Sequence, residues 1–141
     1  MYCFQEVSDN FSKLDGGGDQ SAQLAVLLPG FRPVFRPAIE AVDDDERLHR
    51  LGNMTLSRLP VLQITNHLLP WPGAGSVRNM RRHALEVTVR AAFGPVRVVN
   101  THLEYHSVTQ REAQIVRLLD LQEEASSNPR AARRHVDPYD S

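Results

Sequence analysis

Two stretches in the second half of the chain carry the clearest strand patterns. Over His83–Ala92, apolar and polar positions alternate, so that Leu85, Val87 and Val89 share one face. The stretch Val96–Leu103 is nearly all apolar as far as position 100, which is typical of a strand buried on both faces. A Gly-Pro pair joins the two stretches, and this link has the length of a β-hairpin turn.

Shorter strands are predicted earlier in the chain. An apolar run at residues 2–4 reads as a short buried strand that ends in the polar pair Gln5-Glu6. A proline-interrupted edge strand is predicted over Arg32–Ile39. Two more are predicted over Gly52–Ser57 and Val61–Leu69. The acidic stretch Ala41–Arg50 lacks the spaced oxygens and the glycine of a calcium loop, so we expect a solvated loop there.

Two helices complete the pattern. The first is predicted over Gln20–Leu28, with Asp19 or Ser21 as its cap, and a Pro-Gly pair ends it. The second is predicted over Thr109–Ala125, opened by a capping box of Thr109 with Glu112. Strands and helices of this kind predict an α+β fold. We expect one domain over residues 1–125 and a loose, polar, arginine-rich tail over residues 126–141.

Composition narrows the class of protein. The 141 residues suffice for one domain, and 41% hydrophobic residues indicate a globular chain. No apolar run is long enough for a transmembrane helix, and no signal peptide is evident. The lone Cys3 excludes an internal disulfide framework, so we expect a cytoplasmic protein.

The net charge of −1 hides an asymmetry along the chain. Residues 1–46 hold nine acidic residues against three basic ones, whereas residues 47–141 hold eight against thirteen. A basic second half could face phosphate groups, and a mixed solvated surface explains the same counts equally well.

Polar side chains appear where two apolar strands end. Glu6 follows the first strand, and a carboxylate there is a candidate ligand for a hard cation such as Mg²⁺. Asn100 and His102 close a later strand and point to the same face. An imidazole at such a place can protonate a leaving group or stabilise a charged oxygen. Taken alone, Glu6 is more simply interpreted as a surface glutamate at a strand end. Taken alone, His102 is more simply interpreted as a core histidine that is hydrogen-bonded to the backbone.

The order of these segments is more specific than any one of them. Gln5-Glu6-Val7 is followed by Gly52-Asn53-Met54-Thr55-Leu56-Ser57-Arg58-Leu59-Pro60-Val61, then by Asn100-Thr101-His102-Leu103, and then by Arg111 and Gln114 in the last helix. This series resembles the endonuclease/exonuclease/phosphatase superfamily, the metal-dependent phosphohydrolases that include DNase I-like nucleases, inositol phosphatases and sphingomyelinases. The resemblance spans about residues 2–121.

The resemblance implies a role for each matching position. Glu6 would bind the catalytic Mg²⁺ or Mn²⁺, and His102 would hydrogen-bond the phosphoryl oxygens and stabilise the transition state. Asn53, Arg58 and Asn100 are the candidate substrate contacts. Arg111 and Gln114 would anchor the last helix to the sheet, and His106 is expected to be a surface histidine.

The resemblance also implies a fold and marks what this chain lacks. Family members are four-layer α/β/β/α sandwiches, of which this chain would supply about the first half without the opening strand. The family's Gly-Asp-Phe-Asn segment and its terminal Asp-His pair do not occur here. We therefore expect a truncated or mis-started reading frame, a relic without activity, or a chain that pairs with a second chain to complete the sandwich.

Three functions stay open from the sequence. The first is a metal-dependent phosphohydrolase acting on a phosphate ester, weak or inactive in this chain. The second is a non-catalytic module that binds nucleic acid or another anionic partner through the basic half. The third is an unrelated α+β domain in which Glu6 and His102 are structural.

Overall fold

The computed structural model describes residues 1–128 and shows a small α+β domain with two antiparallel three-stranded sheets. The first sheet has the order β1-β3-β2, from Tyr2–Asp9, Leu48–Ser57 and Arg32–Val42. The second has the order β4-β5-β6, from Val61–Leu68, His83–Ala91 and Gly94–Thr101. The helices are α1 (Ser12–Asp15), α2 (Gln20–Leu27) and α3 (Val108–Ser127).

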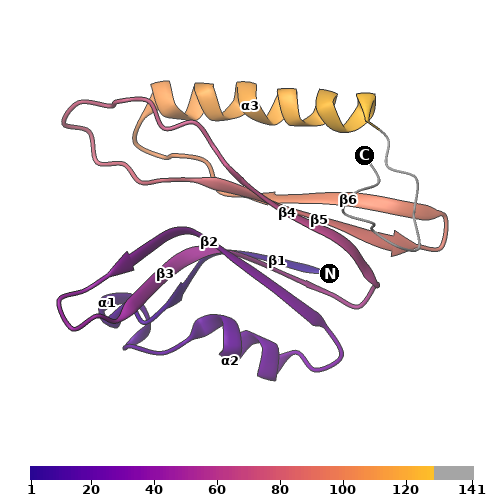
Figure 1. The fold of residues 1–141 in the computed structure, drawn as a ribbon, viewed down its shortest axis with the longest axis horizontal. Helices are drawn as coiled ribbons and strands as arrows, with labels where there is room; N and C mark the ends of the chain where they lie inside the picture. The colour runs from indigo at the N-terminus through magenta and orange to yellow at the C-terminus, as the bar shows by residue number, and fades with distance from the viewer. Residues whose placement is uncertain (129–141) are drawn as a thin grey trace.

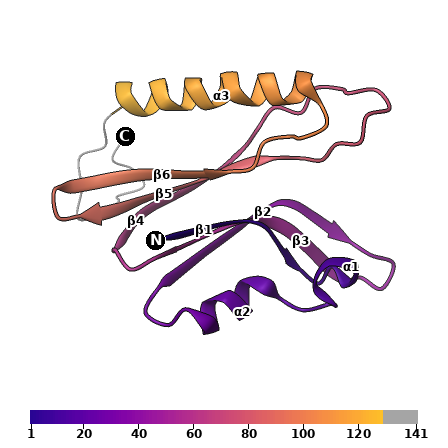
Figure 2. The ribbon, with the colours of Figure 1, turned by 180° about the vertical axis from the view of Figure 1, so that it is seen from behind.

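The elements form four layers in space. Figures 1 and 2 show the two sheets stacked face to face, with α2 outside the first sheet and α3 outside the second. The predicted α+β class and the α/β/β/α layer order are therefore present in this chain. The helix α3 continues to Ser127, two residues beyond the expected domain boundary. The rest of the predicted tail, residues 129–141, lies outside the described residues.

The strand β3 is buried on both faces, and its two faces differ in chemistry. Met54 and Leu56 form a core with Val7 and with apolar side chains of α2. The alternate positions Asn53 and Thr55 are also buried. Because successive side chains of a strand point to opposite faces, these polar groups lie on the face turned toward the second sheet. They need hydrogen-bond partners there.

A second core fills the space between the sheets. Leu85, Val87 and Val89 of β5 pack with Val34 of β2. The three β5 residues share one face, as the alternation predicted. His83 has the same parity along β5, so it also faces the first sheet.

The structure corrects three sequence-based expectations. The strand β6 ends at Thr101 and is not buried on both faces, since Asn100 is its one buried residue and the others are half-buried or exposed. The predicted loop over Ala41–Arg50 is shorter than expected: residues 43–47 form the turn, and its two ends are strand, since β2 runs to Val42 and β3 begins at Leu48. Asp43 forms the tight turn between them by accepting hydrogen bonds from the backbone N–H groups of residues 45 and 47.

The third correction concerns the start of α3. The helix begins one residue earlier than expected, and its N-cap is Ser107, whose side chain accepts a hydrogen bond from the backbone N–H of Gln110. The prediction that Thr109 and Glu112 form a capping box is therefore wrong. Ser107 and Gln110 stand at the same spacing, and Ser107 is the residue with the extended backbone that a cap requires. By contrast, α2 is capped by Asp19, as predicted.

Gly52 marks the closest approach of two backbones in the first sheet. A Cβ placed on Gly52 would lie 2.0 Å from the carbonyl oxygen of Arg36 and 2.6 Å from the Cα of Pro37. Both contacts are with backbone atoms, which cannot rotate away. The strand pair β2–β3 therefore requires glycine at this position, next to the pocket described below.

We predict that Gly52→Ala lowers the free energy of unfolding by about 1–3 kcal/mol or more, because two packed strands must separate. Urea denaturation measures this change. Gly73→Ala is the matched control, since a Cβ at Gly73 meets no atom within 4 Å, and we expect a change within about 0.5 kcal/mol. Equal stability of the two variants would show that the backbone approach at Gly52 is not restrictive.

Candidate functional site

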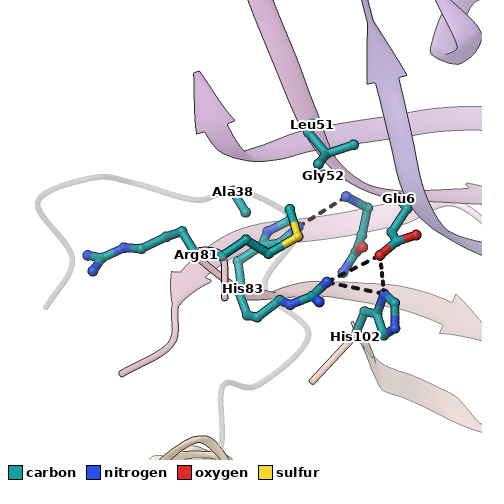
Figure 3. Close-up of a pocket in the computed structure, with 10 residues that line it drawn as sticks. Glu6, Ala38, Leu51, Gly52, Arg81, His83 and His102 are labelled. Atoms are coloured by element: carbon teal, nitrogen blue, oxygen red, sulfur yellow. Dashed lines mark hydrogen bonds and ion pairs between the residues drawn. The ribbon is translucent and has the colours of Figure 1, made fainter. Parts of the chain in front are cut away.

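A small pocket lies where the middle of β1 meets the start of β5 and the segment that follows β6 (Figure 3). Its lining comes from both sheets and from the segment that precedes β5. The ten lining residues are Glu6, Ala38, Leu51, Gly52, Asn53, Met80, Arg81, Arg82, His83 and His102.

Glu6 reaches the pocket because the strand β1 is irregular there. The pairing of β1 with β3 shifts between Phe4 and Val7, which is the mark of a β-bulge. Glu6 itself has a φ of 55°, in the left-handed region that a residue with a side chain seldom occupies. A bulge redirects a side chain relative to a regular strand, and here it turns the carboxylate toward His102, as Figure 3 shows.

Glu6 and His102 meet although 96 positions separate them in the sequence. The Oε1 atom of Glu6 lies 3.3 Å from Nδ1 of His102. The resemblance implies that both residues act at one site, and this distance shows that their side chains are neighbours. Glu6 is 55% exposed and His102 36% exposed, so solvent reaches both groups.

Arg82 completes the cluster and was missed by sequence reasoning. Its Nη1 atom lies 3.4 Å from Oε1 of Glu6 and 3.4 Å from Nδ1 of His102. Nδ1 of His102 therefore faces both a carboxylate, which can only accept a hydrogen bond, and a guanidinium, which can only donate one. The cluster combines a carboxylate, a fixed positive charge and an imidazole.

A buried carboxylate, Glu104, holds Arg82 in place. The side chain of Glu104 is fully buried, and its Oε2 atom lies 3.4 Å from Nε of Arg82. Its oxygens also accept hydrogen bonds from the backbone N–H groups of Met80 and His106. Burial alone would raise the pKa of Glu104, but these two hydrogen bonds and the charge of Arg82 outweigh it and hold the pKa below its ordinary value.

The two predicted anchors of α3 act on this same segment. Gln114 accepts a hydrogen bond from the backbone N–H of Glu104 through its buried side chain. Arg111 donates to the carbonyl oxygens of Glu104 and Tyr105. Both residues therefore tie α3 to the segment after β6. His106 is exposed, as expected.

Asn100 joins the two sheets and is not among the pocket-lining residues. Its side-chain amide is buried and donates hydrogen bonds to the carbonyl oxygens of Phe4 and Met54. These bonds hold β6 against β1 and β3, which places Glu6 next to His102. The geometry therefore gives Asn100 a structural position, and its role as a substrate contact stays a prediction.

The other two candidate substrate contacts differ in their positions. Asn53 lines the pocket, and its side chain donates to the carbonyl oxygen of Asn100. Arg58 is not brought to the pocket wall. It lies beyond the end of β3, where its guanidinium stacks over the ring of Phe31 at 4.6 Å from the ring centre.

His83 is buried in the pocket wall as a neutral ring. Its Nε2 atom accepts a hydrogen bond from the backbone N–H of Asn53, so Nδ1 carries the proton and donates to Oδ1 of Asn66. Burial lowers the pKa of His83 to about 4. Protonation of Nε2 would turn the acceptor of the Asn53 N–H into a donor and break this hydrogen bond. The folded state therefore favours the neutral ring.

No group of three or more histidine, cysteine or carboxylate side chains that could enclose a metal ion occurs among residues 1–128. In the same range, no helix is long and apolar enough to cross a membrane.

Comparisons with known proteins assign no family. No family model matches the chain, and searches of curated proteins and of solved structures also find no match. The functional argument therefore depends on the geometry of the pocket.

We predict that His83 makes stability depend on pH. Its folded pKa is depressed below the unfolded value of about 6.5, so its contribution is fully present above that value and is lost as the pH falls toward about 4. Between about pH 7 and pH 5 this contribution falls by about 2 kcal/mol.

Urea unfolding of the wild type and of His83→Gln at both pH values isolates the effect from the other titrating groups. The wild type should lose more stability than the variant. Parallel losses in the two proteins would show that His83 does not carry this pH dependence.

Proposed function

We propose that the pocket binds a phosphate ester and that the chain is a metal-dependent phosphohydrolase of weak activity. The observation that supports this most is the cluster of Glu6, Arg82 and His102, with 3.3–3.4 Å between the polar atoms of its members. Hydrolysis of a phosphate ester requires neutralisation of phosphoryl charge, and Arg82 supplies a positive charge that is fixed in place.

His102 suits the transfer of a proton to the departing oxygen. With Nδ1 turned toward Arg82 and Glu6, Nε2 faces away from them, and a protonated ring would donate from Nε2 to the leaving alkoxide and end as the neutral imidazole. Asn53, held by Asn100, forms part of the wall against which the phosphate would lie. These groups come from both sheets, so the folded sandwich is what positions them.

Glu6 would hold a Mg²⁺ or Mn²⁺ ion. Mg²⁺ in phosphoryl-transfer sites is bound by one or two carboxylates, by water and by the phosphate itself. A half-exposed carboxylate beside a phosphate pocket fits that donor set, and it does not fit a closed metal cage. When bound, the ion would polarise a phosphoryl oxygen and lower the pKa of bound water.

The same geometry accounts for weak activity. Among the described residues that line the pocket, Glu6 is the one carboxylate. Glu104 is close in sequence to His102, but its oxygens are occupied by Arg82 and by two backbone N–H groups. The described pocket therefore offers a phosphate site and a proton donor without a second acidic group that would activate water.

A partner that completes the sandwich belongs to the same proposal. In the described part of the chain, β1 and β6 each pair on one side only. Unpaired backbone groups of edge strands can accept a further strand. A second chain that pairs there would be the source of the missing acidic group.

The proposal predicts slow, Mg²⁺-dependent hydrolysis of bis(4-nitrophenyl) phosphate, at a rate well below the ~10 s⁻¹ typical of enzymes. 4-Nitrophenolate leaves without a proton, so this substrate tests the hydrogen bond from His102 to the phosphoryl oxygens. His102→Ala should lower the rate about a hundredfold, and Glu6→Gln should remove the dependence on Mg²⁺. Phe93→Ala is the control, because Phe93 is exposed and precedes β6, whereas His102 follows the other end of that strand. Release of 4-nitrophenolate measures the rate.

Two results would contradict the proposal. The first is a rate that His102→Ala leaves unchanged. The second is the absence of turnover together with salt-sensitive binding of an anionic polymer that Glu6→Gln does not weaken. The second result would favour the alternative of a non-catalytic anion-binding module, in which Arg82 acts without a metal ion.

A further inference from the structure

An open groove adjoins the pocket on the side of α3. It is lined by His102, Leu103, Glu104, Tyr105 and Arg111. His102 belongs to both the groove and the pocket. If the phosphate lies in the pocket, the part of the ester that extends past His102 must therefore enter the groove.

The groove presents one large exposed ring, that of Tyr105. The residue is 78% exposed, although the segment that carries it is firmly held. Arg111 donates to the carbonyl oxygen of Tyr105 at 2.8 Å and to that of Glu104 at 3.0 Å. On the other side of Tyr105, the backbone N–H of His106 donates to the buried carboxylate of Glu104. The backbone is thus fixed both before and after the exposed ring.

The ring of Tyr105 also has a defined neighbour. The imidazole of His106 packs against it in a T-shaped arrangement, with 5.0 Å between ring centres and an interplanar angle of 88°. This contact restricts a side chain that already has few rotatable bonds, so little conformational entropy remains to be lost on binding. The structure therefore presents a preorganised aromatic surface beside His102.

We propose that Tyr105 is a stacking platform for a flat aromatic ring in the alcohol part of the substrate. The substrate class is then a phosphate ester with an aromatic substituent, either a nucleotide or an aryl ester. This inference rests on the proposed function, because the phosphate must occupy the pocket for the substituent to reach Tyr105.

The surroundings of Tyr105 favour an aromatic ligand over a lipid chain. Its immediate neighbours are the polar residues Glu104 and His106, and Arg111 lines the same groove. An acyl chain requires a continuous apolar surface. A planar ring requires one exposed aromatic face and gains from a nearby guanidinium, and the groove offers both.

Binding measurements by titration calorimetry in excess Mg²⁺ test the inference. The probes are adenosine 5′-monophosphate, phenyl phosphate and ribose 5-phosphate, which share the phosphate and differ in the ring. We expect the wild type to bind at least one aromatic probe about fivefold or more tightly than ribose 5-phosphate. A preference for the nucleotide alone identifies a nucleobase, and a preference for both aromatic probes identifies any flat ring.

Three variants assign that preference to Tyr105. Tyr105→Ala should abolish it and leave the affinity for ribose 5-phosphate within about twofold, whereas Tyr105→Phe should keep it. Phe93→Ala is the control, since Phe93 is 87% exposed in the β5–β6 turn and precedes β6, whereas His102 follows the other end of that strand. This control should change no affinity.

Failure of the inference is distinguishable from failure of the proposed function. Equal affinity of the wild type for all three probes, or a preference that survives in Tyr105→Ala, would overturn the stacking platform alone. The absence of binding of any of the three phosphate compounds would overturn the phosphate site and the platform together.

Discussion

The pocket depends on a buried ion pair between Glu104 and Arg82. Burying one charge is costly, and burying two is tolerated when they face each other and their remaining polar atoms are hydrogen-bonded. Glu104 meets that condition through Arg82 and the backbone N–H groups of Met80 and His106. These contacts join the segment before β5 to the segment after β6. Arg82 consequently has a fixed position, from which Nη1 reaches both Glu6 and His102.

Polar groups between the sheets then bring the two halves of the site together. Asn100 donates to backbone oxygens of β1 and β3, and His83 accepts from the backbone N–H of Asn53. A sandwich core is usually apolar, and here its apolar part, centred on Leu85, Val87 and Val89, fills the space farther along β5. The polar end of the interface is therefore where the pocket forms, and the bulge that contains Glu6 opens onto it.

Local patterns in the sequence predicted much of this architecture. The alternation over Leu85, Val87 and Val89 identified the inner face of β5. Polar residues after two apolar runs marked Glu6 and His102 as candidates, and the family resemblance was what implied that they share one site. Arg82 and Glu104 carried no such signal, because an arginine before a strand and a glutamate after one are ordinary surface residues until the fold buries them. Asn100 was interpreted as a substrate contact because the sequence cannot show that its amide is used between the sheets. The start of α3 was misplaced because two capping patterns overlap, and only the backbone conformation of Ser107 decides between them.

A double-mutant cycle on the free energy of unfolding tests most directly whether Glu104 holds Arg82. The variants are Arg82→Met, Glu104→Gln and the combination of both, unfolded in urea at neutral pH. Arg82→Met alone should cost about 3 kcal/mol, because it leaves a buried carboxylate without its cation. Glu104→Gln should cost at least about 1 kcal/mol less in the Arg82→Met background than in the wild type. Additive costs, within about 0.5 kcal/mol, would contradict the account, because they would show that the two charges do not depend on each other.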